Sequence, residues 1–180
     1  NPLVKTAHEL ISSGSIGTPR ILTAETKYFD KDLSDYALFH GLYDGISVLE
    51  MLFGSTRINK VFSKKVTTND SIFYVSLLNL DDESVCHLVS GTSSVESKLE
   101  FSLNGTGGLV TFNESDTLIS PSQSKNSRTI KEAELLFHTF SGFLKNGADG
   151  QSLESYKVAS AIEKSAIQNR PIFLRGNAVG

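Results

Sequence analysis

Apolar residues recur with a helical period in one stretch of the chain, residues 39–54. They follow one another at steps of four, three and four, as on one face of an α-helix: Leu42, Ile46, Leu49 and Phe53. Gly54 comes directly after the last of them, where a glycine in the left-handed conformation commonly ends a helix. The pattern therefore predicts an amphipathic helix that packs one face on a core.

A second stripe on the same predicted helix is polar. His40, Asp44 and Ser47 lie about 200° around the helix from the apolar face, at about 100° per residue. His40 and Asp44 are neighbours at i and i+4, so the carboxylate can orient the imidazole for proton transfer. The alternative is an ion pair on a solvent-facing helix surface, which contributes only about tenths of a kcal/mol.

Other segments have the composition and alternation of β-strands. Residues 20–29 predict a first strand with Leu22, Ala24, Thr26 and Tyr28 on one side. After the helix, further strands are predicted at residues 57–66, 71–80, 84–90, 96–103 and 109–113. The turns between them are short, and parallel neighbours would need long crossovers, so we expect consecutive antiparallel hairpins.

The polar residues within these predicted strands indicate that one sheet face is less apolar than the other: Ser76, Asn79, His87 and Ser90. Such a face is either solvated or covered by a partner. The helical period returns at residues 131–147 and 156–168, and it also occurs at residues 2–11. In the 156–168 helix the residues expected to face inward are Val158, Ala161, Ile162, Ala166 and Ile167.

A last short strand is predicted at residues 171–174. Segregated strands and helices in this order predict one α+β domain over residues 1–180, with an open, mostly antiparallel mixed sheet and helices packed on one face. The polar loop at residues 30–35 places carboxylates before the helix, where its positive end favours them. The chain opens on Asn1-Pro2 without a methionine, which we interpret as a fragment boundary.

Composition narrows the functional classes. The 180 residues are 39% hydrophobic and carry a net charge of −3, so no broad basic surface is expected to bind nucleic acid or anionic lipid. No apolar run approaches the ~20 residues of a membrane span. Cys86 is the one cysteine, which excludes an intrachain disulfide and favours a cytoplasmic location.

Several other chemistries find little support in the sequence. Gly105, Gly107 and Gly108 precede a strand rather than a helix, so they predict a hairpin turn and not a phosphate loop. The four histidines lack the spacing of a metal site, so no metal is expected. Cys86 lies within an apolar strand, where a thiol acts as a small hydrophobe.

Four segments, in order along nearly the whole chain, carry a resemblance to a known family. They are LISSGSIGTPRI at residues 10–21, LEMLFG at 49–54, ELLFHTF at 134–140 and AIEKSAIQNRPI at 161–172. Together they resemble the C-terminal domain of the glucose-fructose oxidoreductase, inositol dehydrogenase and rhizopine catabolism family (Gfo/Idh/MocA). That resemblance implies a preceding Rossmann domain, whose glycine-rich fingerprint this chain lacks, and NAD or NADP bound by that domain.

The resemblance also implies roles for the polar stripe. The family pattern places an Asp on the equivalent helix and a His four residues later, whereas this chain has His40 and then Asp44, with Ser47 where a further Asp is frequent. We therefore expect His40 and Asp44 as the catalytic pair and Ser47 as a substrate-binding residue. Lys27, Tyr28 and His87 are further substrate-binding candidates.

Two functions follow from this reading. The first is the substrate-binding and dimerisation domain of an NAD(P)-dependent oxidoreductase acting on a sugar, polyol or related hydroxy compound, inactive as the isolated chain and forming a homo-oligomer through its sheet. The second is a non-catalytic binding or scaffold module that kept the fold and lost the dehydrogenase chemistry.

Overall fold

The computed structural model describes residues 9, 11–53, 58–112, 117–121, 128–130 and 153–174. The predicted helices at residues 2–11 and 131–147 lie outside the described residues, apart from Glu9 and Ile11, and so does Gly54. The first elements are β1 (Pro19–Phe29), α2 (Asp35–Phe53), β2 (Ile58–Thr67), β3 (Ser71–Leu80) and β4 (Val85–Ser93). They are followed by β5 (Lys98–Gly105), β6 (Gly108–Phe112), β7 (Thr117–Pro121), β8 (Arg128–Ile130), α4 (Leu153–Gln168) and β9 (Ile172–Phe173).

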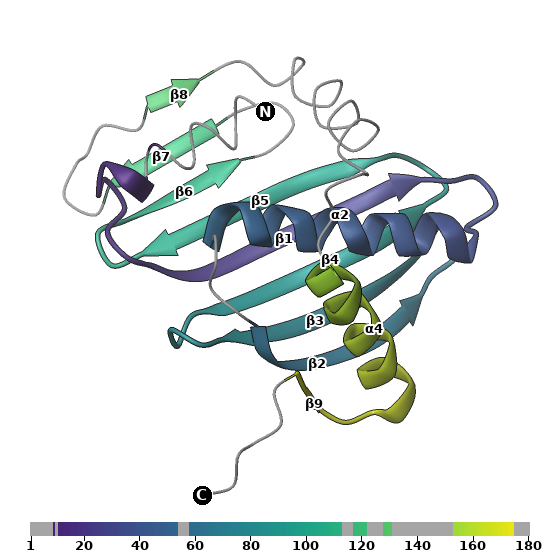
Figure 1. Ribbon diagram of the computed structural model, residues 1–180. Helices are drawn as coiled ribbons and strands as arrows, with labels where there is room; N and C mark the ends of the chain where they lie inside the picture. The colour runs from purple at the N-terminus through teal and green to yellow at the C-terminus, as the bar shows by residue number, and fades with distance from the viewer. Residues whose placement is uncertain are drawn as a thin grey trace, which may run out of the picture.

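The strands form one nine-stranded sheet in the order β8-β7-β6-β5-β1-β4-β3-β2-β9. All its neighbours are antiparallel except β1 and β4, which run parallel. Figure 1 shows α2 lying across the middle of the sheet and α4 beside it on the same face. The predicted α+β class, with an open mixed sheet and helices on one face, is confirmed.

The expectation of uninterrupted hairpins is wrong at one point. β1 lies between β4 and β5, pairing Thr23 with His87 on one side and with Ser102 on the other. The long crossover that a parallel pair needs is provided by α2, β2 and β3, which separate β1 from β4 in the chain. Residues 94–97 are enough to step over β1, because neighbouring strands lie only about 4.8 Å apart.

The covered face of the sheet is the one under α2 and α4, and its side chains form the core. Alternate residues of β1 point into it, so Leu22, Ala24 and Thr26 are all buried. The predicted apolar face of α2 is confirmed, since Leu42 and Ile46 are fully buried against these strands. α4 covers β2 with Val158, Ala161 and Ile162.

Two predictions about orientation are wrong. Ser76 and Ser90 lie buried on the covered face, whereas Asn79 and His87 alternate to the opposite face, so the four polar residues do not mark one surface. Ile167 is 83% exposed. Two residues along a helix turn the side chain by about 200°, so Ile167 points away from the core once Ser165 points into it.

Ser165 is buried because it completes backbone hydrogen bonds at the edge of the sheet. Its hydroxyl oxygen accepts from the Ser63 N–H at 2.9 Å, and its O–H donates to the Arg170 carbonyl at 2.8 Å. A serine can therefore occupy a position that hydrophobicity alone would assign to an apolar residue, since buried polar groups require partners.

Glycine allows α2 to approach the sheet unusually closely. A Cβ built on Gly41 would lie 1.8 Å from the carbonyl oxygen of Gly91, and one on Gly45 would lie 2.6 Å from a methyl of Leu88. The Gly41 carbonyl is also within hydrogen-bonding reach of two hydroxyls, those of Thr26 and Ser90, which contact each other at 2.7 Å. Helix and sheet are thus joined by backbone and hydroxyl contacts as well as by apolar packing.

We expect Gly41→Ala to destabilise the protein by about 1–3 kcal/mol, the usual cost of overpacking, because the obstructing atom is backbone. Urea unfolding would measure it. In a helix without this contact the same substitution stabilises by about 0.5–1 kcal/mol, so a gain in stability would contradict the close approach.

Candidate functional site

The loop before α2 fixes where that helix begins. Ser34 is its N-cap: the Ser34 Oγ accepts from the Ala37 N–H at 3.2 Å, and the Ser34 carbonyl accepts the first helical bond from Leu38 at 3.0 Å. One carboxylate oxygen of Asp30 accepts from both the N–H and the O–H of Ser34, at 2.8 and 2.5 Å. These bonds hold the pKa of Asp30 below its ordinary value. Asp30 thus holds the capping residue, and Asp35 places another carboxylate in the first turn of α2.

Three rings meet where the first turns of α2 lie over the end of β1: Tyr36 and His40 from α2 and Tyr28 from β1, which we call the aromatic triad. The His40 ring meets Tyr36 edge to face, with centroids 4.4 Å apart, and Tyr28 lies 6.2 Å away. Tyr28 is 45% exposed and Tyr36 75% exposed, and His40 is exposed as well. The triad therefore lies at the molecular surface, on the same side of the sheet as α2.

The end of β1 is held in place beneath the triad. The Thr92 hydroxyl donates to the Tyr28 carbonyl at 2.9 Å, and the Asp30 N–H donates to the Ser93 carbonyl at 2.8 Å. Since β1 and β4 run parallel, both strands end at the same edge, next to the start of α2. Tyr28 and His40, two of the predicted site residues, are brought together at this edge.

The other predicted residues of the polar stripe differ from His40. The Ser47 hydroxyl donates to the Tyr43 carbonyl one turn earlier, at 3.0 Å, and is half-buried. The backbone of Asp44 is helical, but its side chain lies outside the described residues. His40 is therefore the one member of the stripe whose described side chain combines exposure with ring contacts.

A second polar group joins α2 to α4. The Ser155 hydroxyl lies 2.8 Å from both carboxylate oxygens of Glu50. Burial raises the pKa of the nearby Tyr43 phenol, against a hydrogen bond with Ser155 that lowers it. Phe39 of α2 and Tyr156 of α4 also connect the two helices, with ring centroids 6.3 Å apart. Neither these residues nor Tyr36 stood out in the sequence, although the position of Tyr36 four residues before His40 was a usable signal.

Lys27 and His87 lie on the other side of the sheet. They belong to the open face, which carries no described helix. It consists of alternate residues of the central strands: Ile21, Thr23, Glu25, Lys27, Phe29, Phe73, Val75, Leu77, Asn79, Val85, His87, Val89, Lys98, Glu100 and Ser102. The sheet separates both residues from His40. A small molecule in contact with His40 would therefore not reach them.

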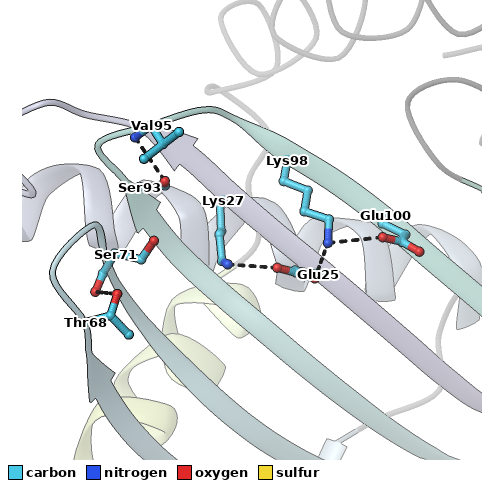
Figure 2. A network of polar contacts seen from close by, with 8 residues as sticks. All are labelled: Glu25, Lys27, Thr68, Ser71, Ser93, Val95, Lys98 and Glu100. Carbon is cyan, nitrogen blue, oxygen red and sulfur yellow. Dashed lines mark hydrogen bonds and ion pairs between the residues drawn. The ribbon is translucent and has the colours of Figure 1, made fainter.

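Charges on the open face are paired with one another (Figure 2). Glu25 binds Lys27 at 2.9 Å and Lys98 at 2.6 Å, and Lys98 also binds Glu100 at 3.2 Å. Burial tends to raise the pKa of Glu25, but the bonds and charges of Lys98 and Lys27 outweigh it, so that the pKa is lowered. The aliphatic part of the face remains accessible, with Ile21 and Leu77 46% and 44% exposed.

The structure also decides two alternatives raised by the sequence, those on the glycine cluster and on Cys86. The glycine cluster is the β5–β6 hairpin, as predicted, and its Thr106 and Gly107 N–H groups donate to the carbonyls of Thr18 and Ile16 rather than facing a ligand. Cys86 is fully buried, and burial raises the pKa of its thiol, which disfavours the nucleophilic thiolate. Within the described ranges no cluster of His, Cys, Asp and Glu could hold a metal ion.

Among the described helices, none is long and apolar enough to cross a membrane. No family model matches the sequence. No curated protein matches it significantly either.

Solved structures do share the fold. A NAD binding oxidoreductase from Klebsiella pneumoniae aligns with 98% of this chain at a TM-score of 0.73 and 14% identity, over 64% of its own length. An inositol dehydrogenase homolog from Azotobacter vinelandii, complexed with NADH and myo-inositol, aligns with 95% of this chain at a TM-score of 0.67 and 11% identity. The alignment covers 61% of the homolog's own length. Levoglucosan dehydrogenase in complex with NADH and L-sorbose aligns with 94% of this chain at a TM-score of 0.63 and 14% identity, over 62% of its own length. The chain thus spans about three fifths of each of these oxidoreductases.

We expect Ser34→Ala to destabilise the protein by about 1 kcal/mol, because the first turn of α2 loses its cap. The change should also raise the pKa of Asp30 toward its ordinary value, since one of its donors is gone. A carboxyl group with a lowered pKa stabilises the fold at pH values above its unfolded-state pKa of about 3.9. This stabilisation is lost as the pH falls through the folded-state pKa.

The variant should therefore lose less stability than the parent on acidification below about pH 4. Urea unfolding across pH and an NMR titration of the Asp30 carboxyl measure both effects. Ser160→Ala, in the middle of α4, is the matched control. An unchanged Asp30 titration in Ser34→Ala would contradict the hydrogen bond from the Ser34 hydroxyl, and an unchanged stability would contradict the cap.

Proposed function

We propose that this chain is the substrate-binding and oligomerisation domain of an NAD(P)-dependent oxidoreductase of the Gfo/Idh/MocA type. The observation that carries the proposal is the fold likeness, which runs along 98% of the chain but along only 64% of a NAD binding oxidoreductase. The remaining share of such a protein is long enough for a separate cofactor domain.

The substrate class proposed is a sugar, a polyol or a related hydroxy compound. Two of the solved structures with this fold are complexes with NADH and either myo-inositol or L-sorbose, which are polyhydroxylated molecules. The exposed imidazole of His40, with two phenols beside it, offers this chain groups that can hydrogen-bond to hydroxyls.

The nicotinamide cofactor is assigned to a separate domain, because the glycine cluster of this chain is a hairpin whose N–H groups are already bonded. A bound nicotinamide would supply the hydride chemistry. His40 is proposed to take the proton from the reacting hydroxyl, or to return it in the reverse direction. Asp44 at i+4 is proposed to orient the imidazole. Ser47 and Tyr28 are proposed to bind the substrate.

The test requires the protein expressed from the whole natural reading frame. We expect NAD(P)-linked oxidation of a polyol, and a loss of about 10²–10⁴-fold in kcat for His40→Gln, because this change removes proton transfer and keeps a side chain of similar reach. Ser160→Ala is again the control. The isolated 180-residue chain should give no turnover, since it supplies no hydride acceptor.

Three outcomes would count against parts of this proposal. Turnover by the isolated chain would remove the need for a second domain. An unchanged kcat in His40→Gln would show that His40 does not transfer the proton. A whole-frame protein without activity would favour the non-catalytic binding module, which the reversed order of His40 and Asp44 also permits.

We further propose that the open face pairs with a second copy of the chain. Its exposed apolar side chains include Ile21, Phe29 and Leu77. Its carboxylates and ammonium groups are already joined to one another within the plane of the sheet, so a partner can cover them without leaving a charge unpaired. An apolar face with internally paired charges suits a two-fold interface between identical surfaces. Lys27 and His87 would then belong to the interface.

Light scattering tests the pairing. We expect about twice the monomer mass of 19.6 kDa for the parent, and a return to the monomer mass for Leu77→Lys, which places a charge in the apolar part of the open face. Tyr156→Lys, at an exposed position on α4, should leave the mass unchanged. A monomeric parent would contradict an interface on this face.

A further inference from the structure

Tyr36 is more exposed than its role in the fold requires. The residue is 75% exposed, in the first turn of α2, whereas the nearby Ala37 and Leu38 are buried in the core. A side chain so exposed contributes little apolar burial, and tyrosine is not among the strong helix formers. The need for a stable α2 therefore does not account for an aromatic ring at this position.

The polar atoms of the aromatic triad are also available. Among the hydrogen bonds between described residues, none involves the phenol oxygens of Tyr28 and Tyr36 or the imidazole of His40. The ring contacts, in contrast, are made: the edge-to-face contact with His40 uses at most one face of the Tyr36 ring. The triad thus presents an aromatic surface bordered by three unshared hydrogen-bonding groups.

This surface is also preorganised. The Ser34 cap fixes the turn that carries Tyr36, and the bond from Thr92 to the Tyr28 carbonyl fixes the end of β1. A rigid ring loses little conformational entropy when a ligand packs on it. The loop at residues 30–35 contributes three carboxylates and one lysine, and Lys65 pairs with the Asp35 carboxylate at 3.7 Å. The charge that remains is negative, which disfavours a ligand bearing a phosphate or a carboxylate.

We propose that Tyr36 is a substrate-binding residue that stacks on a neutral, ring-form polyol such as a cyclitol or a hexopyranose. The C–H groups on one face of such a ring are weakly positive and pack on the negative face of an aromatic ring. The hydroxyls at its rim then reach Tyr28 and His40. This assignment rests on the proposed function, which it refines from hydroxy compounds in general to cyclic and uncharged ones.

Binding to the 180-residue chain tests the assignment without cofactor or turnover. The probes are myo-inositol, the open-chain polyol sorbitol and the charged glucose 6-phosphate, with NMR following the ring resonances of Tyr36 and His40. We expect saturable shifts with myo-inositol and at least about fivefold weaker binding of the other two, since sorbitol lacks a ring face and the phosphate is repelled.

Variants separate the ring from its hydroxyl. Tyr36→Ala should weaken myo-inositol binding by about 5–10-fold, and Tyr36→Phe by no more than about twofold, because the stacking face is kept. Tyr156→Ala removes an exposed tyrosine from α4 and should bind like the parent. Equal losses in Tyr36→Phe and Tyr36→Ala, an unchanged affinity in Tyr36→Ala, or no shifts at saturating myo-inositol would each overturn the assignment.

The two proposals can fail separately. If the protein expressed from the whole reading frame binds myo-inositol through Tyr36 but transfers no hydride, the role of Tyr36 stands and the oxidoreductase function is wrong. If the protein transfers hydride and Tyr36→Ala leaves KM unchanged, the oxidoreductase function stands and the role of Tyr36 is wrong.

Discussion

The contact between α2 and the sheet at Gly41 determines the geometry of the rest of the molecule. Helices usually rest on sheets through layers of large side chains, but here the backbone of one helical turn nearly touches the backbone of β4. The Thr26 and Ser90 hydroxyls lie in the small space that remains and reach the Gly41 carbonyl. Since a hydroxyl buried without a partner is costly, these groups specify one depth and one register for the helix.

That register explains why the candidate site lies where it does. His40 precedes Gly41 directly, so the point of closest approach is one residue from the imidazole. Tyr28 comes two residues after Thr26 on the same side of β1. Two side chains from different elements are thus positioned by a buried contact next to them. A functional side chain supported in this way needs no hydrogen bond of its own to keep its orientation.

The sequence allowed the elements to be predicted more accurately than their arrangement. Period and turn residues located β1 to β6 to within about three residues, because these signals are local, but they missed the first turn of α2 and the strands β7 and β8. The insertion of β1 between β4 and β5 depends on pairing between distant residues, which no local pattern reports. Ile167 was misassigned because a buried serine took the inward position. Of the aromatic triad, the sequence singled out His40 and Tyr28 but not Tyr36, because a tyrosine four residues before a histidine is a usable signal only once the exposure of both rings is known.

The central place of β1 also has a consequence for how the chain acquires its structure during synthesis. Ile21 pairs with Val85, about sixty residues later, so at a translation rate of about 5–20 residues per second β1 waits several seconds for its parallel partner. Both of its hydrogen-bonding edges are open during that time, and its antiparallel partner β5 is made later still. The two halves of the sheet are joined only when β1 enters between them. Folding of this sheet therefore depends on β1 remaining unaggregated until β5 has been made.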